Sequence, residues 1–145
     1  SDPGFVTKLQ PRGVMLERFN PLALVIMEEV SLVARSFAAE RDHLREIMKE
    51  VLQHDDGFVL LDILQPCVSF NERNTYQWYR ERVEPVDDSH DPWDREQAME
   101  LAMKWGDEIP IGVIYRNDRE SFESKMGMKD KQPLERQFAE AAGQA

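Results

Sequence analysis

Apolar and polar positions alternate with helical spacing in the clearest segment of the chain. The apolar residues lie three, four, seven and eight positions apart, at Leu44, Ile47, Met48, Val51 and Leu52. This spacing gives a helix one apolar face, so it predicts a helix that packs against a core. The polar residues 54–57 then end the helix.

A nearly continuous apolar run follows over residues 58–64, interrupted only by Asp62. Such runs are typical of strands that are buried on both faces, which predicts a central parallel strand. Asp62 would be costly to bury unpaired, so we expect it to have a hydrogen-bonding partner, such as an arginine or a backbone amide. A helix followed by a strand, repeated along the chain, predicts an α/β fold with a mostly parallel sheet flanked by helices.

Helix-start residues precede three other segments. Asn20-Pro21 predicts a helix to about residue 29, because asparagine caps a helix and proline needs no donor partner in the first turn. Asn74 or Thr75 predicts the start of a second helix, which carries aromatic residues. Asp91-Pro92 predicts a third, which Gly106 ends.

Two further runs predict strands. Residues 32–35 suit a short buried strand, and residues 109–115 suit a longer one. Pro110 lies within the second run and cannot donate to a ladder of hydrogen bonds. It therefore indicates either an edge strand or the start of a strand.

Composition and charge limit the classes of function. The 145 residues include 28 acidic and 18 basic side chains, a formal net charge of −10. This balance argues against nucleic-acid binding, which depends on lysine and arginine. The single cysteine excludes an internal disulfide, and we expect a cytoplasmic location. No apolar run reaches the roughly 18 residues that are needed to cross a membrane. The sequence begins with Ser1 rather than methionine, so we expect its N-terminus to be a cut end rather than a natural start.

Cys67 follows the apolar run 58–64 and Pro66, which directs the chain out of the sheet. Its thiol is therefore expected at the carboxyl end of the strand, where open α/β sheets bind ligands. One interpretation is a metal or cluster ligand. The other is a buried small hydrophobe, which is how free cysteines usually behave. The spacing alone favours the second, because no Cys-x-x-Cys partner is present.

The remaining candidate residues indicate no complete active site. The histidines do not have the spacing of metal ligands. A mononuclear metal site that joins Cys67 to His54 or His90 therefore has little support from the sequence. The acidic run 87–91 lacks the pattern of a calcium loop. We predict no catalytic residue and no cofactor-binding residue. The aromatic residues in the stretch 76–79 could stack on a base or a cofactor ring, but packing inside the fold or at a subunit interface is more common. These residues are Tyr76, Trp78 and Tyr79.

Two consecutive blocks of sequence carry a family resemblance. Residues 62–71 read Asp-Ile-Leu-Gln-Pro-Cys-Val-Ser-Phe-Asn, and residues 74–83 read Asn-Thr-Tyr-Gln-Trp-Tyr-Arg-Glu-Arg-Val. They closely resemble the C-terminal half of the β subunit of 2-oxoacid:ferredoxin oxidoreductases. Shorter blocks resemble the same family in the same order, so the resemblance spans residues 13–116. The Val-Ser-Phe-Asn after Cys67 resembles the 2-oxoacid or 2-oxoglutarate branch more than the pyruvate branch.

The resemblance implies an oxidative decarboxylation of a 2-oxoacid to an acyl-coenzyme A. In such enzymes thiamine diphosphate, with magnesium, supplies the carbanion that attacks the keto carbon, and an iron-sulfur cluster passes electrons to ferredoxin. The cysteine of the family's Pro-Cys motif is a ligand of that cluster, and Cys67 matches it. The resemblance also implies a partial thiamine-diphosphate-binding-type layer as the fold. We expect Phe70, Asn71, Tyr76, Trp78 and Tyr79 to contribute interface surface.

The chain departs from the family where the other cofactor ligands should be. The upstream half, with its other cluster cysteines and its Gly-Asp-Gly motif for diphosphate and magnesium, does not occur in these residues. We therefore expect the chain alone to bind no cofactor and to be inactive, and to need the missing N-terminal half or an α subunit as its partner. The alternative is a non-enzymatic acidic interaction domain that keeps the fold without the catalytic half. Exposed apolar surface could also produce a homo-oligomer.

We divide the chain into four segments. Residues 1–18 form an extended lead-in, and residues 19–83 form the helix-strand core that ends in the Pro-Cys motif and the aromatic helix. Residues 84–116 form the C-terminal extension of the β subunit. Residues 117–145 form a charged tail, with a short helix expected near residues 133–142.

Overall fold

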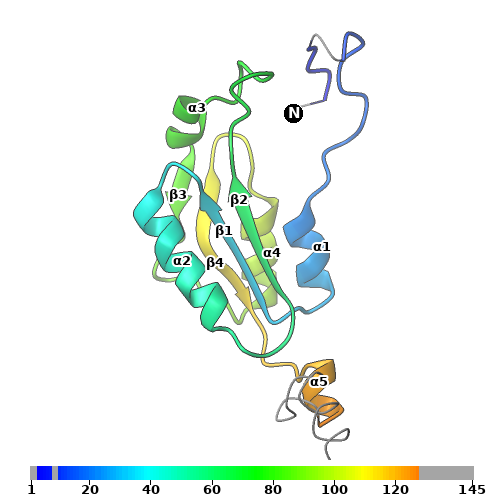
Figure 1. The fold of residues 1–145 in the computed structure, drawn as a ribbon, viewed down its shortest axis with the longest axis vertical. Coiled ribbons are helices and arrows are strands. Elements are labelled where there is room, and N and C mark those ends of the chain that lie inside the picture. The colour runs from blue at the N-terminus through cyan, green and yellow to red at the C-terminus, as the bar shows by residue number, and fades with distance from the viewer. Residues whose placement is uncertain (1–2, 8–9, 128–145) are drawn as a thin grey trace, which may run out of the picture.

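One mixed sheet with helices on both faces organises the chain (Figure 1). The computed structural model describes residues 3–7 and 10–127. Within these residues the strands lie in the order β2-β1-β4-β3. The elements in chain order are α1 Pro21–Met27, β1 Leu32–Phe37, α2 Arg41–Gln53, β2 Val59–Leu64, α3 Tyr76–Arg80, β3 Val83–Pro85, α4 Arg95–Met103, β4 Ile109–Arg116 and α5 Phe122–Lys125. The predicted α/β fold is confirmed.

The strands pair mostly in parallel, as expected. β1 is parallel to β2, and β3 is parallel to β4, whereas the two pairs meet through antiparallel β1 and β4. The predicted central position of residues 58–64 is wrong for this chain. β2 lies at the edge of the described sheet, and Ile63 is 42% exposed. An apolar run shows which residues can be buried, but it does not specify which strands become neighbours.

Pro110 lies in an interior strand, close to where that strand begins. β4 is paired on both sides, and Pro110 is its second residue. The strand-start interpretation is therefore correct and the edge interpretation is wrong. Since the first residues of a strand make the fewest ladder hydrogen bonds, the missing donor costs least there.

Capping side chains determine where the helices begin. Asn20 caps α1 by accepting a hydrogen bond from the Ala23 amide at 3.1 Å, and Thr75 rather than Asn74 caps α3. The third start was predicted too early. Asp94, not Asp91, caps α4, because its carboxylate accepts from the amides of Glu96 and Gln97.

The other boundaries differ by a few residues. α1 ends at Met27 rather than near residue 29, and α4 ends at Met103 rather than at Gly106. β3 was not predicted, because only its first residue, Val83, is apolar. The short helix expected near residues 133–142 lies outside the described residues.

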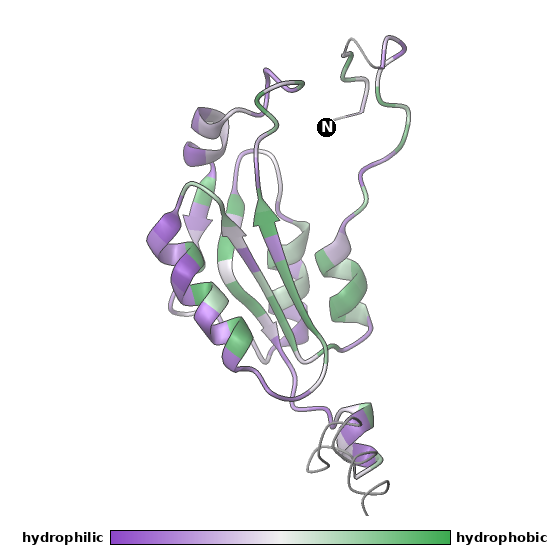
Figure 2. Cartoon of the chain, in the orientation of Figure 1, coloured by the Kyte–Doolittle hydropathy of each residue, from purple (hydrophilic) through white to green (hydrophobic). Residues whose placement is uncertain are grey.

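The side chains of β1 alternate between the two faces of the sheet. Val33 packs in a cluster with residues of α1, α4 and β4, while Ser36 faces α2, where its hydroxyl lies 2.8 Å from His43 Nδ1. A second cluster joins Phe37 to Tyr79 and to the first residues of β4. Figure 2 shows apolar residues along the strands and α1, and a mixture of apolar and polar residues along α2. Arg35 therefore lies on the same face as Val33 and Phe37.

His43 gives the fold a pH-dependent contact. Burial lowers the pKa of His43 below its usual value of 6.5, and the nearby Glu40 carboxylate opposes this shift. The folded state therefore favours the neutral form of His43. This preference stabilises the fold fully above the usual pKa of 6.5, and the stabilisation is lost as the pH falls through the lower pKa that His43 has in the folded state. We expect urea midpoints to fall between about pH 7 and pH 5. The change should be smaller in His43→Gln, whereas an equal change in both proteins would contradict this assignment.

Candidate functional site

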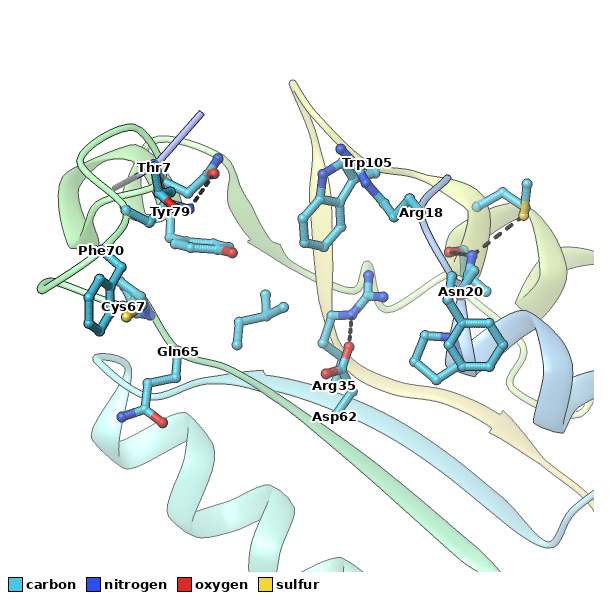
Figure 3. Close-up of a pocket in the computed structure, with 18 of the residues that line it drawn as sticks. Thr7, Arg18, Asn20, Arg35, Asp62, Gln65, Cys67, Phe70, Tyr79 and Trp105 are labelled. Carbon is cyan, nitrogen blue, oxygen red and sulfur yellow. Dashed lines mark hydrogen bonds and ion pairs between the residues drawn. The ribbon is translucent and has the colours of Figure 1, made fainter. Parts of the chain in front are cut away.

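A cavity of about 960 Å³ lies at the carboxyl ends of β1 and β2. Its walls come from the N-terminal lead-in, both strands, the turn after β2, α3 and the end of α4 (Figure 3). Such a volume is typical of a site for a small molecule or cofactor. Parallel strands direct their carboxyl ends to one edge of a sheet, which is where α/β folds bind ligands.

Cys67 lies in the wall of this cavity with an exposed thiol (Figure 3). The expected position at the carboxyl end of the strand is confirmed, because β2 ends at Leu64. The interpretation as a buried hydrophobe is wrong. The turn is closed by the Cys67 carbonyl, which accepts hydrogen bonds from the Asn71 amide at 2.9 Å and the Phe70 amide at 3.4 Å.

Asn71 holds the other end of this turn. Its side-chain carbonyl accepts from the amides of Arg73 at 3.0 Å and Asn74 at 2.9 Å. Its amide group donates to Asn74 Oδ1 at 3.0 Å, and Asn74 is only 8% exposed. The Asn71 side chain therefore contributes directly to the shape of the segment that presents Cys67.

Replacing Asn71 should loosen the turn without unfolding the chain. Asn71→Ala removes three side-chain hydrogen bonds and leaves two backbone amides without this acceptor. We expect hydrogen exchange at the Arg73 and Asn74 amides to be about fivefold faster, since each amide loses a hydrogen bond that contributes roughly 1 kcal/mol. The exposed neighbour Glu72 offers a control, and Glu72→Ala should leave both amides unchanged. Unchanged exchange in Asn71→Ala would contradict the assigned role.

Arg35 and Asp62 form an ion pair on neighbouring strands at the floor of the cavity. Arg35 Nε lies 2.9 Å from Asp62 Oδ2, and the two residues are partners in the β1–β2 register. The predicted need of Asp62 for a partner is confirmed, with arginine as the partner. Trp105 lies over this pair, with its ring centroid 5.7 Å from Arg35 Cζ and 4.7 Å from Arg18 Cζ.

Of the three aromatic residues of α3, Tyr79 is buried inside the fold, Trp78 is half-buried and Tyr76 is exposed. Tyr79 is 9% exposed and lies 5.4 Å from Phe37, 4.9 Å from Trp78 and 6.4 Å from Trp105, measured between ring centroids. Tyr76 is more exposed at 37%. These contacts connect α3 to β1 and to the segment after α4. The interface role of these residues stays a prediction.

The cavity brings together part of the predicted set. Cys67, Phe70, Asn71 and Tyr79 line it, whereas Tyr76 and Trp78 do not. Among the described residues, no group of three or more His, Cys, Asp or Glu side chains could hold a metal ion. In the same part of the chain no helix is long and apolar enough to cross a membrane.

Among the described residues that line the cavity, sequence reasoning missed several, including Arg18, Arg35 and Trp105. Arg35 carried a usable signal, because it is a charged residue in an apolar strand, as Asp62 is in the next one. Two opposite charges in neighbouring buried strands indicate a pair. Arg18 gave no such signal, because it lies in a segment without regular secondary structure.

Known proteins resemble this chain in both sequence and fold. The family of the C-terminal region of the pyruvate ferredoxin oxidoreductase beta subunit matches residues 67–131. The 2-oxoacid:ferredoxin oxidoreductase subunit beta of a Sulfolobus species is 36% identical over 123 residues, which cover 77% of this chain and 40% of that protein. The corresponding Saccharolobus solfataricus subunit is 35% identical over 128 residues, 79% of this chain and 41% of that protein.

A solved structure extends the likeness to the fold. A 2-oxoglutarate:ferredoxin oxidoreductase from Magnetococcus marinus, with 2-oxoglutarate, coenzyme A and succinyl-CoA bound, superposes with a TM-score of 0.77. It is 28% identical, and the match covers 97% of this chain and 50% of that one. The chain thus spans about 40% of the length of the curated relatives named above. Sequence and fold together identify the chain as a relative of the C-terminal part of the β subunit of 2-oxoacid:ferredoxin oxidoreductases.

Proposed function

We propose that this chain is the C-terminal portion of a 2-oxoacid:ferredoxin oxidoreductase β subunit and supplies Cys67 as one ligand of an iron-sulfur cluster. The observation that supports this role is the exposed thiol in the cavity wall, on a turn closed by backbone hydrogen bonds. A cluster ligand must project from a fixed backbone toward open space. Cysteine thiolates are the usual ligands of such clusters.

This chain can supply one cysteine ligand of an iron-sulfur cluster. Cys67 is the only cysteine of the chain, and a cubane or rhombic cluster takes about four thiolates. The other ligands would come from the upstream half of the β subunit. When bound, the cluster carries electrons away from the reaction toward ferredoxin. The residues of this chain present the thiol and hold its turn.

The other cofactors and partners follow from the same proposal. Thiamine diphosphate and magnesium would bind to the missing N-terminal half, and this chain alone would bind none of the cofactors and be inactive. An α subunit, ferredoxin and coenzyme A would complete the enzyme, which we place in the cytoplasm. A solved relative is named as a 2-oxoglutarate enzyme, which supports a substrate of the 2-oxoglutarate branch.

Reconstitution tests the enzymatic role against that of an acidic interaction domain. The chain is combined with an upstream half that carries the Cys-x-x-Cys and Gly-Asp-Gly motifs and with an α subunit, then supplied with iron, sulfide and thiamine diphosphate. We expect a brown protein that reduces a dye when 2-oxoglutarate and coenzyme A are added, whereas the chain alone should do neither. A stable complex without colour or dye reduction would favour the interaction domain.

A further inference from the structure

The helix α2 keeps part of its apolar surface exposed. It packs on the sheet against β1, β2 and β4, and Ile47 on its inner side is buried. Leu44, Met48 and Leu52 follow one another at intervals of four residues, and Met48 and Leu52 are 41% and 78% exposed. Residues four apart lie on one side of a helix, so these three form a continuous apolar stripe along α2.

A groove of about 470 Å³, the α2 groove, is lined by this stripe and by a row of cations. The cations are Arg41, Arg45 and Lys49, which also follow at intervals of four. None of the acidic side chains in the described part of the chain lines it, and Glu46, which pairs with Arg45 and Lys49, lies outside the lining. An apolar stripe with a cationic border suits an amphipathic helix that carries acidic residues, because charged residues flank the apolar seam where helices pack.

Residues 128–145 continue the chain from a point beside one end of this groove. The Ser124 hydroxyl of α5 lies 3.1 Å from both carboxylate oxygens of Asp56, in the loop that follows α2. Figure 1 shows α5 at the same end of the molecule as the last turn of α2. The described residues end at Gly127, directly after α5. The rest of the chain therefore starts near the C-terminal end of the α2 groove.

The sequence of residues 133–142 matches what this groove requires. The apolar residues of the segment have the spacing of one helical face; they are Leu134, Phe138, Ala141 and Ala142. Two of its charged residues are acidic and one is basic, so its net charge is opposite in sign to that of the groove lining. Isolated helices shorter than about 12 residues are marginal in water, so a helix of this length depends on the packing of its apolar face.

The lengths of the groove and of the segment also agree. Residues 128–132 span up to about 17 Å when extended, which is enough to reach the last turn of α2 from Gly127. A helix over residues 133–142 is about 15 Å long, and the stripe from Leu44 to Leu52 covers about 12 Å at the same rise per residue. A helix that starts beside Leu52 therefore covers the whole stripe when it runs antiparallel to α2.

We propose that residues 133–142 form a helix that packs into the α2 groove, antiparallel to α2, with Leu134 beside Leu52 and Phe138 beside Met48. This contact removes exposed apolar surface of both helices from water. The short connection gives the segment an effective concentration of about millimolar, which favours it over a second copy of the chain. The contact involves neither Cys67 nor an iron-sulfur cluster, so the proposal goes beyond the proposed function and does not depend on it.

Disulfide trapping in the 145-residue chain tests this register. Cys67→Ser removes the native thiol, and Met48→Cys with Phe138→Cys places one thiol on each side of the proposed contact. Diamide then oxidises the two thiols by accepting their two electrons and two protons. We expect the intramolecular disulfide to form at least about tenfold faster than in the matched pair Glu46→Cys with Phe138→Cys. The control position lies on the same helix with a side chain that is 62% exposed, but outside the groove.

Mass spectrometry separates the possible products of this oxidation. A fast disulfide within one chain, confined to the Met48 pair, is the expected result. Equal rates for the two pairs, or no disulfide in either, would overturn the proposal. Disulfide-linked dimers as the main product would also overturn it and would assign the α2 groove to a second copy of the chain.

Hydrogen exchange gives a second readout without new cysteines. Met48→Ser combined with Leu52→Ser removes the exposed part of the stripe and leaves the buried Ile47 in place, so the chain should stay folded. We expect the amides of residues 134–142 to exchange at least about tenfold faster in this variant than in the unmodified chain. Leu24→Ser on α1, where the side chain is 51% exposed, is the matched control and should leave their exchange unchanged. Equal exchange of these amides in all three proteins would contradict the proposed contact.

Discussion

Cys67→Ser should abolish cluster-dependent activity in the assembled enzyme while leaving the chain folded. A serine hydroxyl is a poor substitute for a thiolate, so the cluster would lose one of its ligands. Mutating a residue that only hydrogen-bonds to a metal ligand commonly lowers metal affinity or activity by about 10- to 100-fold. We therefore expect the loss of the ligand itself to reduce 2-oxoacid-dependent ferredoxin reduction by at least about 100-fold. Iron content and the visible absorption of the purified complex should fall in parallel.

Because Cys67 is exposed, we expect Cys67→Ser to lower iron content and activity without changing the stability of the fold. The thiol is at the surface of this chain, so the substitution creates no cavity and the thermal midpoint of the isolated chain should be nearly unchanged. The adjacent Val68 is 71% exposed and provides a matched control. Val68→Ser should retain both iron and activity. Full iron content in Cys67→Ser would contradict the ligand role.

Phe37→Ala should be the most destabilising single change in the fold. Phe37 is fully buried at the end of β1, with its ring centroid 5.4 Å from that of Tyr79 and 6.0 Å from that of Tyr76. Truncating a buried phenylalanine typically lowers the free energy of unfolding by about 3–5 kcal/mol. The total free energy of unfolding of a domain is about 5–15 kcal/mol, so the variant should unfold at a much lower urea concentration than the unmodified chain.

An exposed phenylalanine provides the comparison. Phe58 is 59% exposed just before β2, so Phe58→Ala should change the free energy of unfolding by less than about 1 kcal/mol. Urea titrations followed by far-ultraviolet circular dichroism measure both variants under the same conditions. Similar midpoints for the two variants would show that the aromatic cluster around Phe37 contributes little to the stability of the fold.

Local sequence signals predicted the elements better than their arrangement. The apolar spacing of residues 44–52 matches α2, and the Asn20-Pro21 pair matches the start of α1, because both signals depend on neighbours along the chain. The edge position of β2 and the antiparallel contact of β1 with β4 depend on pairing between distant segments. No periodic pattern in either strand encodes that choice.

The site was predicted in part for the same reason. Pro66 and the end of the apolar strand indicated where Cys67 would lie, and the chain geometry places it there. The neighbours of Cys67 across the cavity come from segments far away along the chain, including Arg35 and Trp105. Their proximity arises from tertiary packing, which the apolar and polar pattern alone does not specify.

Alkylation of Cys67 before and after cluster assembly tests the proposed ligand role most directly. Iodoacetamide modification, quantified by mass spectrometry of the peptide that contains Cys67, reports whether the sulfur is free. In the isolated chain the exposed thiol should be modified readily. In the reconstituted brown complex we expect strong protection, which is lost when a chelator removes the iron. Equal modification of Cys67 in the isolated chain and in the iron-loaded complex would contradict its role as a cluster ligand.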